Sequence, residues 1–517
     1  MAKYTNPVLP GFYPDPSVCR VGDDYYLVTS SFEYFPGVPV FHSRDLAHWR
    51  QIGHCLTRPE QLPLEHAPSS GGIYAPTIRH HDGRFYMVTT NVSNGGHFYV
   101  STDDPAGSWS DPIWVPFSSE HGEGRSIDPS LFFDDDGKVY FTCNQSKIGI
   151  FQFEIDITTG EQLTASRLIW TGTGGQYPEA PHLYKINGMY YLLIAEGGTG
   201  YGHMVTIARS DQPYGPFESC PDNPILTHRS SDLPIQATGH ADLIQTPAGD
   251  WWLVCLGIRP NPQNRSWPPY HHLGRETFLA PVTWTKTGWP QVGPVELAVE
   301  VESLPGESPV YDDEQTKDYH EDFAIPELAL HWNFLRNPRS EDWSLDSHPG
   351  NLTLYGSELT LDDAGSPACV LRRQQHFRCL ISTGTTFDPA RDGEEAGLTV
   401  FMNENHHYDL ALVRWNGQRC AIVRRRIGSL SAIVAQMPLP PGRVTLAVEA
   451  DYLYYIFRCG LTGGEMHTLA TGETRYLSTE VAGGFTGVYL GMYATGSGQR
   501  SSTPALFDYF EYHPYDS

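Results

Sequence analysis

The sequence lacks long hydrophobic runs and has few positive charges. No apolar stretch approaches the roughly 20 residues of a membrane helix, and residues 1–7 lack the apolar core of a signal peptide. Lys and Arg number 34 against 60 Asp and Glu, giving a formal net charge of −26. Because phosphate binding requires a basic face, this balance argues against nucleic acid as a partner and favours a neutral small-molecule substrate.

Cysteine motifs and nucleotide-binding loops are also absent. The nine cysteines are scattered and include no Cys-x-x-Cys pair, so neither a disulfide framework nor a zinc site is indicated. Gly197-Gly198-Thr199-Gly200 follows a predicted strand, but no Lys-Ser/Thr continues it as a phosphate loop requires. We therefore expect a cytoplasmic protein with no membrane partner and no dinucleotide or serine-hydrolase chemistry.

Helical periodicity is nearly absent, and short β-branched and aromatic runs broken by Gly-containing turns take its place. Five hairpins resemble one another, and they span residues 19–30, 77–90, 131–143, 182–195 and 243–256. Each follows a residue of distinctive chemistry, and these residues recur at intervals of roughly 50 to 60 positions, as propeller blades do. The recurring residues are Asp15, Tyr74, Asp128, Glu179 and His240.

This repeat predicts an all-β protein that begins with a five-bladed β-propeller over residues 1–300. Because the first strand of every blade lines the axis, the five recurring residues would converge on one funnel. The acidic, Pro-containing stretch 301–321 is typical of a linker. Residues 322–517 show short alternating strands without the blade repeat, which favours a β-sandwich of the concanavalin or laminin-G jelly-roll type.

Three acidic residues, Asp15, Asp128 and Glu179, stand in similar Pro-containing settings. The prolines on both sides of Asp15 stiffen its backbone and so direct its carboxylate. Glycoside hydrolysis needs one carboxyl to protonate the leaving oxygen and another to activate water or attack carbon. Asp15 and Glu179 are the candidates, and Asp128 could hold the pKa of the acid up. The alternative is that each is an ordinary turn residue, as an Asp before Pro commonly is.

Other residues could bind sugar or metal. Arg275 offers a rigid donor fork for vicinal hydroxyls, or else forms an ion pair between blades. Phe32, Tyr74 and Phe507 could form apolar walls for a pyranose ring, although most aromatic residues in a β protein belong to the core. His240 could hold a structural Ca²⁺ on the propeller axis through water, or be a hydrogen-bonded core histidine. No cofactor is expected for the chemistry.

Three motifs together carry a family resemblance that spans essentially the whole chain. They are residues 6–17, with Phe12-Tyr13-Pro14-Asp15-Pro16-Ser17, then Ser126-Ile127-Asp128-Pro129-Ser130, and then residues 179–185. With them the sequence resembles glycoside hydrolase family 43, in the branch of β-xylosidases with an appended C-terminal sandwich. The resemblance implies an inverting exo-glycosidase. It further implies that Asp15 is the general base, that Glu179 is the general acid, and that Asp128 orients the acid and modulates its pKa.

The resemblance also implies roles for three further residues. Arg275 would bind sugar hydroxyls, and His240 would sit under the site near a calcium or water cluster. Phe507 would reach from the sandwich to help close the pocket. A closed pocket of this kind implies that one terminal sugar is removed at a time.

Tyr74 departs from the family pattern, because many β-xylosidases of this branch have Trp at that position. A smaller ring with a hydroxyl could change the fit to xylopyranose versus arabinofuranose. The sequence therefore predicts a xylan 1,4-β-xylosidase acting on xylo-oligosaccharides, with α-L-arabinofuranosidase side activity and the order of the two left open. The alternatives are a primary α-L-arabinofuranosidase and a non-catalytic sugar-binding protein. We also expect a homo-oligomer.

Overall fold

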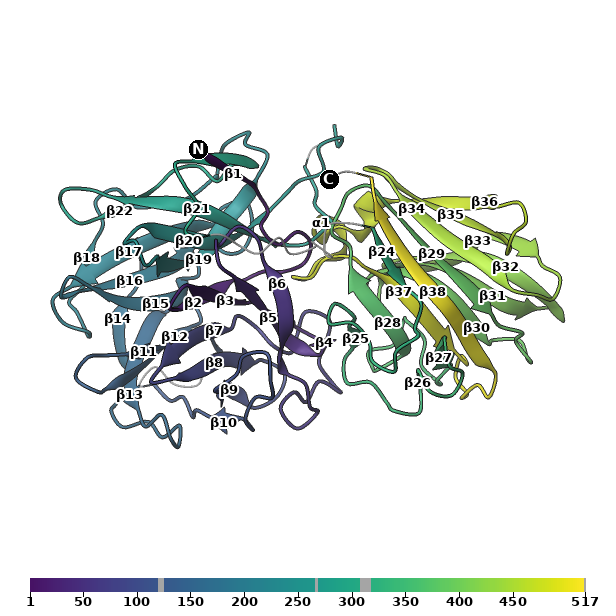
Figure 1. The fold of residues 1–517 in the computed structure, drawn as a ribbon, viewed down its shortest axis with the longest axis horizontal. Coiled ribbons are helices and arrows are strands. Elements are labelled where there is room, and N and C mark those ends of the chain that lie inside the picture. Colours follow the sequence, from purple (N-terminus) through teal and green to yellow (C-terminus); the bar gives the residue numbers. More distant parts are fainter. Residues whose placement is uncertain (120–124, 266–267, 307–317, 516–517) are drawn as a thin grey trace.

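The computed structural model describes residues 1–119, 125–265, 268–306 and 318–515. Nearly all of its regular structure is β-strand, arranged in two domains that lie side by side (Figure 1). The N-terminal domain is a five-bladed propeller and the C-terminal domain is a sandwich, so the predicted fold class is confirmed. In the described ranges, no helix is both long and apolar enough to cross a membrane.

Each propeller blade is a four-stranded antiparallel sheet. Blade 1 consists of β2 (Ser17–Val21), β3 (Asp24–Val28), β5 (Gly37–Ser43) and β6 (Arg50–Leu56). Blade 2 consists of β7 (Thr77–His81), β8 (Arg84–Asn91), β9 (Gly96–Thr102) and β10 (Ile113–Trp114). Blade 3 consists of β11 (Ser126–Phe133), β12 (Val139–Gln145), β13 (Gly149–Ile155) and β14 (Arg167–Trp170).

The last two blades follow the same plan. Blade 4 consists of β15 (Glu179–Ile186), β16 (Met189–Glu196), β17 (Met204–Ser210) and β18 (Glu218–Ser219). Blade 5 consists of β19 (Gln236–Gln245), β20 (Trp251–Ile258), β21 (Glu276–Trp284) and β22 (Pro290–Val292). The five predicted hairpins are the first two strands of the five blades.

Tight turns set the register of these hairpins. Asp82 and Gly83 have φ of 48° and 78°, and Asn187 and Gly188 have φ of 52° and 81°. Two successive residues with positive φ form a type I′ turn, whose twist matches that of antiparallel strands. Asp-Gly and Asn-Gly are the sequences that favour this turn. Because register decides which face each side chain occupies, these turns help to fix which residues of the first strand point toward the axis.

A buried carboxylate joins the inner strands of four blades. Asp242 on β19 accepts hydrogen bonds from the hydroxyls of Ser17, at 2.7 Å, and Tyr184, at 2.6 Å. Arg79 on β7 pairs with the same carboxylate at 2.9 Å. Burial raises the pKa of Asp242, but the charge of Arg79 and the hydrogen bonds from Arg79 and Tyr184 outweigh it and hold the pKa well below its usual range. Blades 1, 2, 4 and 5 are therefore tied together through one ionised group.

Segments of the chain that lie outside the blades close the propeller ring. β1 (Ala2–Thr5) pairs antiparallel with β23 (Ala298–Val301). The side-chain amide of Asn6 donates to the carbonyl of Leu279 at 3.0 Å, on the third strand of blade 5. The N-terminal segment that leads to Asp15 is thus anchored to the last blade.

The sandwich consists of two antiparallel sheets and a short helical connection. The larger sheet contains β24 (Tyr319–Glu321), β26 (Trp343–Ser344), β27 (Leu352–Tyr355), β29 (Cys379–Thr386), β34 (Val444–Ala450), β35 (Tyr454–Leu461), β36 (His467–Glu473) and β38 (Pro504–Pro514). The smaller sheet contains β28 (Ala368–Arg373), β30 (Glu395–Asn403), β31 (His406–Trp415), β32 (Gln418–Ile427), β33 (Leu430–Pro438) and β37 (Tyr489–Thr495). The connection before β37 contains η1 (Thr474–Leu477) and α1 (Thr479–Ala482).

A shared apolar cluster joins the sandwich to the propeller. It combines Phe12, Phe32 and Tyr34 with sandwich residues that include Tyr489. The rings of Tyr34 and Tyr489 stack with their centroids 3.8 Å apart. Two short strands, β4 (Tyr34–Phe35) and β25 (Phe334–Leu335), pair across the same boundary. The two domains therefore share one apolar cluster at their boundary.

Buried arginines of the sandwich reinforce this boundary. Arg336 donates from Nε to the carbonyl of Ala67 at 2.6 Å, and Arg373 donates from Nε to the carbonyl of Phe12 at 2.7 Å. Both side chains are almost fully buried. Since Phe12 precedes Asp15 in the same loop, the sandwich contacts the segment that carries the first candidate carboxylate.

The predicted linker, 301–321, partly falls on residues 307–317, which lie outside the described part of the chain. Its described ends belong to sheets, because β23 ends at Val301 and β24 pairs with β38 from Tyr319 onward. The first strand of the sandwich thus begins before the predicted start at residue 322.

Candidate active site

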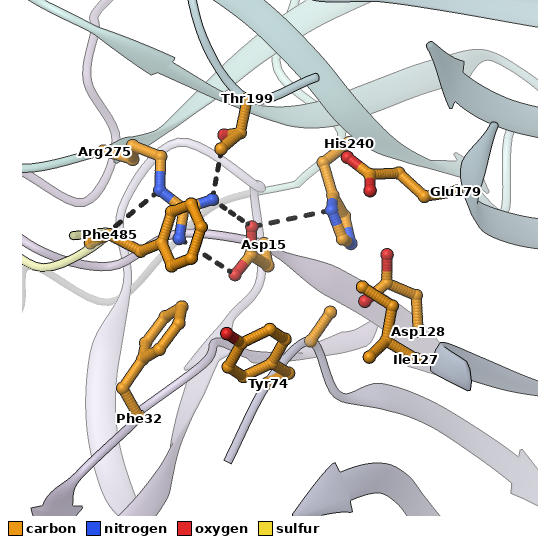
Figure 2. A pocket seen from close by; sticks show the side chains of 11 residues that line it. Asp15, Phe32, Tyr74, Ile127, Asp128, Glu179, Thr199, His240, Arg275 and Phe485 are labelled. Carbon is orange, nitrogen blue, oxygen red and sulfur yellow. Dashed lines mark hydrogen bonds and ion pairs between the residues drawn. The ribbon is translucent and has the colours of Figure 1, made fainter. Parts of the chain in front are cut away.

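A pocket of about 70 Å³ is lined by residues from all five blades and from the sandwich. The five residues that recur along the propeller sequence all line it, and they are Asp15, Tyr74, Asp128, Glu179 and His240. The remaining lining residues are Phe32, Ala75, Ile127, Thr199, Arg275 and Phe485. The five-fold repeat of the chain therefore gathers its distinctive side chains in one place (Figure 2).

Irregularities in the inner strands turn these side chains into the pocket. The pairing of β11 is interrupted at Asp128-Pro129, that of β15 at Ala180-Pro181, and that of β19 around His240. Bulges re-aim side chains next to active sites, and proline within a strand commonly marks one because it cannot donate to the ladder.

The backbone at four lining residues is left-handed. Asp15, Phe32, Asp128 and His240 have φ of 56°, 49°, 54° and 46°. The prolines that flank Asp15 would on their own favour an extended conformation. Non-glycine residues seldom occupy the left-handed region, and they persist there where the surroundings determine the conformation, as at functional sites.

The carboxylate of Asp15 is buried among positively polarised groups. Arg275 Nη1 donates to Asp15 Oδ1 at 2.9 Å, and the hydroxyl of Ser30 donates to Oδ2. His240 Nδ1 lies 3.5 Å from Oδ1. Burial by itself raises the pKa of Asp15, but Arg275, His240 and Ser30 together bring it below its ordinary value. Asp15 is therefore held as a carboxylate.

Glu179 and Asp128 lie on the opposite side of the pocket from Arg275 (Figure 2). Burial raises the pKa of Glu179 well above its ordinary value, and the negative charges of Asp128 and Asp15 raise it further. Burial also raises the pKa of Asp128 to about 6, opposed by His240 and assisted by Asp15. The backbone N–H of Ala180 donates to Asp128 Oδ2 at 3.1 Å, which fixes the residue after Glu179. The pocket thus pairs a carboxyl whose pKa is lowered, Asp15, with one whose pKa is raised, Glu179.

Three aromatic rings form one wall of the pocket (Figure 2). The ring centroid of Phe32 lies 5.1 Å from that of Tyr74 and 6.1 Å from that of Phe485. The guanidinium carbon of Arg275 lies 5.5 Å from the centroid of Phe32 and 5.6 Å from that of Phe485. Arg275 is therefore held both by Asp15 and by the aromatic wall.

Phe507 does not line the pocket, so its predicted place in the site is wrong. It is fully buried in the core between the two sheets of the sandwich, and it pairs with Leu352 across β27 and β38. The aromatic residue that reaches the pocket from the sandwich is Phe485, whose side chain is 38% exposed.

The loop that carries Phe485 is docked on the propeller. The backbone N–H of Phe485 donates to Ser70 Oγ at 2.8 Å, and its carbonyl accepts from Arg275 Nε at 3.4 Å. A Cβ on Gly487 would lie 2.5 Å from the carbonyl oxygen of Leu273, so this close approach requires glycine. Three glycines in residues 483–487 were a signal of a tightly packed loop in the sequence.

Thr199 was not among the predicted site residues. It lies in the connection between β16 and β17, and its hydroxyl accepts a hydrogen bond from Arg275 Nη1 at 3.0 Å. Its glycine-rich segment has no phosphate-loop continuation, but it does bring a polar group to the pocket.

His240 faces Asp15, and its surroundings give little support for direct metal binding. Calcium takes six to eight oxygen ligands. Within the described ranges, no group of three or more His, Cys, Asp or Glu is placed to hold a metal ion. The protein side chains here do not form a calcium site by themselves, so a water-held Ca²⁺ stays a prediction.

Two family models match the chain along its length. The model described as Glycosyl hydrolases family 43 matches residues 4–290. The model described as Beta xylosidase C-terminal Concanavalin A-like domain matches residues 320–513. The fold and the carboxyl-lined pocket are thus those of a glycoside hydrolase. The chain belongs to glycoside hydrolase family 43.

Characterised relatives cover nearly the same length. The chain is 45% identical to "Non-reducing end alpha-L-arabinofuranosidase BoGH43B" of Bacteroides ovatus, over 99% of this chain and 95% of that protein. It is 40% identical to "Xylosidase/arabinosidase" of Butyrivibrio fibrisolvens, over 99% of both chains. A solved structure described as "Bacteroides ovatus Xyloglucan PUL GH43B" superposes with a TM-score of 0.93 at 44% identity, covering 99% of this chain and all of that one.

The two phenylalanines of the sandwich should respond differently to truncation. Phe485→Ala removes part of the pocket wall, so we expect a several-fold increase in KM and a stability loss below about 1 kcal/mol. Phe507→Ala leaves a cavity in a packed core and should cost about 3–5 kcal/mol of unfolding free energy, with KM of the folded fraction unchanged. Steady-state kinetics and denaturant unfolding measure both quantities. An unchanged KM for Phe485→Ala would show that this ring does not contact the sugar.

Proposed function

We propose that this chain is an inverting exo-glycosidase that releases terminal β-D-xylose from xylo-oligosaccharides and also cleaves terminal α-L-arabinofuranosides. The observation that carries the proposal is the convergence of three carboxyls, Asp15, Asp128 and Glu179, on one pocket. Their surroundings lower the pKa of Asp15 and raise that of Glu179. Groups whose environments separate their pKa values in this way suit the roles of base and acid.

In the proposed reaction Asp15 acts as general base and Glu179 as general acid. The oxygen of a water molecule bonds to the anomeric carbon while Asp15 accepts a proton from that water. The bond from the anomeric carbon to the leaving oxygen breaks, and Glu179 gives its proton to that oxygen. Because water attacks from the face opposite the leaving group, the released sugar has the inverted configuration.

Asp128 is proposed to position and tune the acid without bonding to the substrate. Its negative charge raises the pKa of Glu179, and its contact with the N–H of Ala180 fixes the adjacent backbone. Arg275 has the complementary function, because its cation lowers the pKa of Asp15 and keeps the base ionised.

The exo mode rests on the form of the pocket. It is small, at about 70 Å³, and the aromatic wall of Phe32, Tyr74 and Phe485 bounds it. A pocket of this size favours a single terminal sugar over a stretch of polymer. A structural Ca²⁺, a homo-oligomer and a cytoplasmic location stay predictions from the sequence.

Removing the proposed base and acid should have different consequences. Asp15→Ala should lower kcat by about 10²- to 10⁴-fold on all substrates, because water is no longer activated. Glu179→Ala should lower kcat much less on aryl glycosides with good leaving groups than on xylobiose, because a good leaving group needs little protonation. Kinetics with a leaving-group series measure the difference, and proton NMR of fresh product should first show the inverted anomer.

Asp134→Asn is a matched control for these variants. Asp134 is a buried carboxylate of blade 3 that pairs with Lys185 at 2.7 Å, and it does not line the pocket. Its replacement should leave the leaving-group dependence unchanged. Product with retained configuration, or an Asp15→Ala enzyme as active as the wild type, would contradict the proposed mechanism.

The pH profile should depend on Arg275. Its cation lowers the pKa of Asp15 and, more weakly, that of Glu179, so Arg275→Met should raise both. The acid limb of kcat/KM should therefore move to higher pH by about 1–3 units, and the alkaline limb should move in the same direction. Arg209→Met, which removes a cation paired with Glu218 on blade 4, is the control and should leave both limbs in place. An acid limb unmoved by Arg275→Met would exclude Asp15 as the group it reports.

A second candidate is an enzyme that acts primarily as an α-L-arabinofuranosidase. It is favoured by the relative at 45% identity, whose name gives that activity, and by Tyr74 in place of the Trp that many β-xylosidases have. Tyr74 is only partly buried, and its hydroxyl donates to the carbonyl of Ser70 at 3.2 Å. A phenol ring tethered in this way takes up less of the pocket than an indole ring would.

Replacing Tyr74 tests which sugar the wall selects. We expect Tyr74→Trp to shift the ratio of kcat/KM toward the β-D-xyloside by about tenfold, equivalent to about 1.4 kcal/mol of differential binding. The measurement is kcat/KM on the 4-nitrophenyl glycosides of the two sugars, with Tyr74→Phe as the control that removes only the hydroxyl. A wild-type preference for the arabinofuranoside would favour the second candidate, and an unchanged ratio in Tyr74→Trp would exclude Tyr74 as its determinant.

A further inference from the structure

The sandwich contains a second cavity that is larger than the first. It has a volume of about 200 Å³, compared with about 70 Å³ for the pocket in the propeller. At roughly 30 Å³ per water molecule, it has room for about six waters or a small ring. It lies between the smaller sheet and the segment of Thr360, Leu361 and Asp362.

The strand register places polar residues on the face of the sheet that borders this cavity. Thr399, Asp409 and Arg424 stand directly opposite one another on β30, β31 and β32. The adjacent set, Leu398, Leu410 and Val423, is in the same register and packs in the apolar core. Because successive residues of a strand face opposite sides, a charged row lies on the outer face of this sheet, behind the core.

The charged side chains around the cavity contact one another. The buried ring of His407 contacts Asp409 through Nδ1 at 3.0 Å and Asp362 through Nε2 at 2.9 Å. Arg424 forms a two-pronged ion pair with Glu395, with Nη1 2.7 Å from Oε2. A carboxylate has about four acceptor sites and a guanidinium has five donors, so this pairing leaves capacity toward the cavity.

The charges of the cluster balance. The carboxylates of Asp362, Glu395 and Asp409 face the guanidinium of Arg424 and the imidazole of His407, and Arg426 Nε lies 3.7 Å from Asp362. Burial lowers the pKa of His407, but Asp409 and Asp362 overcome this effect and raise it to about 9. Together with Arg426, which neighbours Asp362 but does not line the cavity, three positive groups match three negative groups, which favours neither an anion nor a cation as ligand.

Such a lining suits a neutral ring with several hydroxyl groups. Carboxylates accept hydrogen bonds from pairs of hydroxyls and a guanidinium donates to them. The ring of Tyr493 and the side chain of Leu361 add apolar surface to the same cavity. A purely structural role is a weak explanation for this cluster. The attraction within a buried ion pair rarely outweighs the free energy that is lost when both charges leave water.

We propose that this cavity is a non-catalytic binding site for a neutral sugar unit, formed by Glu395, Asp409, Arg424 and Asp362 of the sandwich. It is separate from the catalytic pocket and does not depend on the reaction proposed there. Each carboxylate has a cationic neighbour, whereas the three carboxyls of the catalytic pocket share one guanidinium.

Calorimetric titration of the full-length chain with xylotriose tests the proposal. The background variant is Asp15→Ala, which the proposed mechanism leaves unable to consume the ligand. We expect two sites, one of which is weakened about tenfold or more by Glu395→Gln through the loss of a charge-assisted hydrogen bond. Asp362 lies at the rim of the cavity, and its side chain is 40% exposed. Asp362→Asn should therefore weaken the same site without altering the packing of the sandwich core.

Matched controls separate binding from folding and from catalysis. Asp392→Asn changes an exposed carboxylate near β30 that does not line the cavity, so it should retain both sites. Placed in the wild-type background, Glu395→Gln and Asp362→Asn should keep the wild-type kcat/KM on an aryl glycoside. Glu395→Gln weakens a largely buried ion pair and should lower the Tm, so circular dichroism at the titration temperature checks that both variants are folded. D-xylose, L-arabinose and D-galactose probe which neutral sugar binds, and D-galacturonate and inorganic phosphate probe charged ligands.

The outcomes decide clearly. A second site that is lost in both cavity variants and retained in Asp392→Asn supports the proposal, even if the chain proves to hydrolyse none of the tested glycosides. A single site, or a second site indifferent to both cavity variants, overturns it. Binding of the charged probes alone would overturn the assignment to neutral sugars.

Discussion

The ion pair between Arg275 and Asp15 is the interaction on which the chemistry of the pocket depends. Three carboxyls lie in one small, largely buried space, and burial raises the pKa of each of them. Arg275 is the strong cation among the residues that line this space, and it is directed at Asp15. Asp15 therefore ionises, and its negative charge then helps Glu179 to keep a proton. A single arginine thus separates carboxyls of similar intrinsic acidity into a base and an acid.

The position of Arg275 depends in turn on the way the propeller closes. Arg275 precedes β21 of blade 5, and its carbonyl accepts from the N–H of Tyr13, at 3.1 Å, in the loop that carries Asp15. Its Nε contacts the carbonyl of Phe485, so the sandwich also holds it. Arg373 of the sandwich binds the carbonyl of Phe12. The first blade, the last blade and the second domain therefore meet at this ion pair.

Much of this arrangement could be predicted from the sequence, and the failures have physical reasons. The repeated hairpins gave the blades, and the position before each hairpin gave five of the residues that line the pocket. Phe507 was misplaced although Ala505 and Phe507 alternate with partly buried positions in β38, a pattern that indicates a core-facing strand. Phe485 stands in a glycine-rich loop, where no periodicity reports which way a side chain points. The left-handed backbone of Asp15 and Asp128 was also invisible, because flanking prolines alone favour extended conformations.

The two cavities show how the ratio of cations to carboxyls determines what a buried acidic cluster can do. In the propeller pocket, Asp15, Asp128 and Glu179 share one guanidinium, and burial raises the pKa of Asp128 and of Glu179. In the sandwich, Glu395 forms an ion pair with Arg424, and Asp409 and Asp362 both pair with His407. Carboxylates that are paired with cations can accept hydrogen bonds from a ligand. The same residue types therefore suit catalysis in one domain and binding in the other, and the difference lies in the number of cations that each fold brings to them.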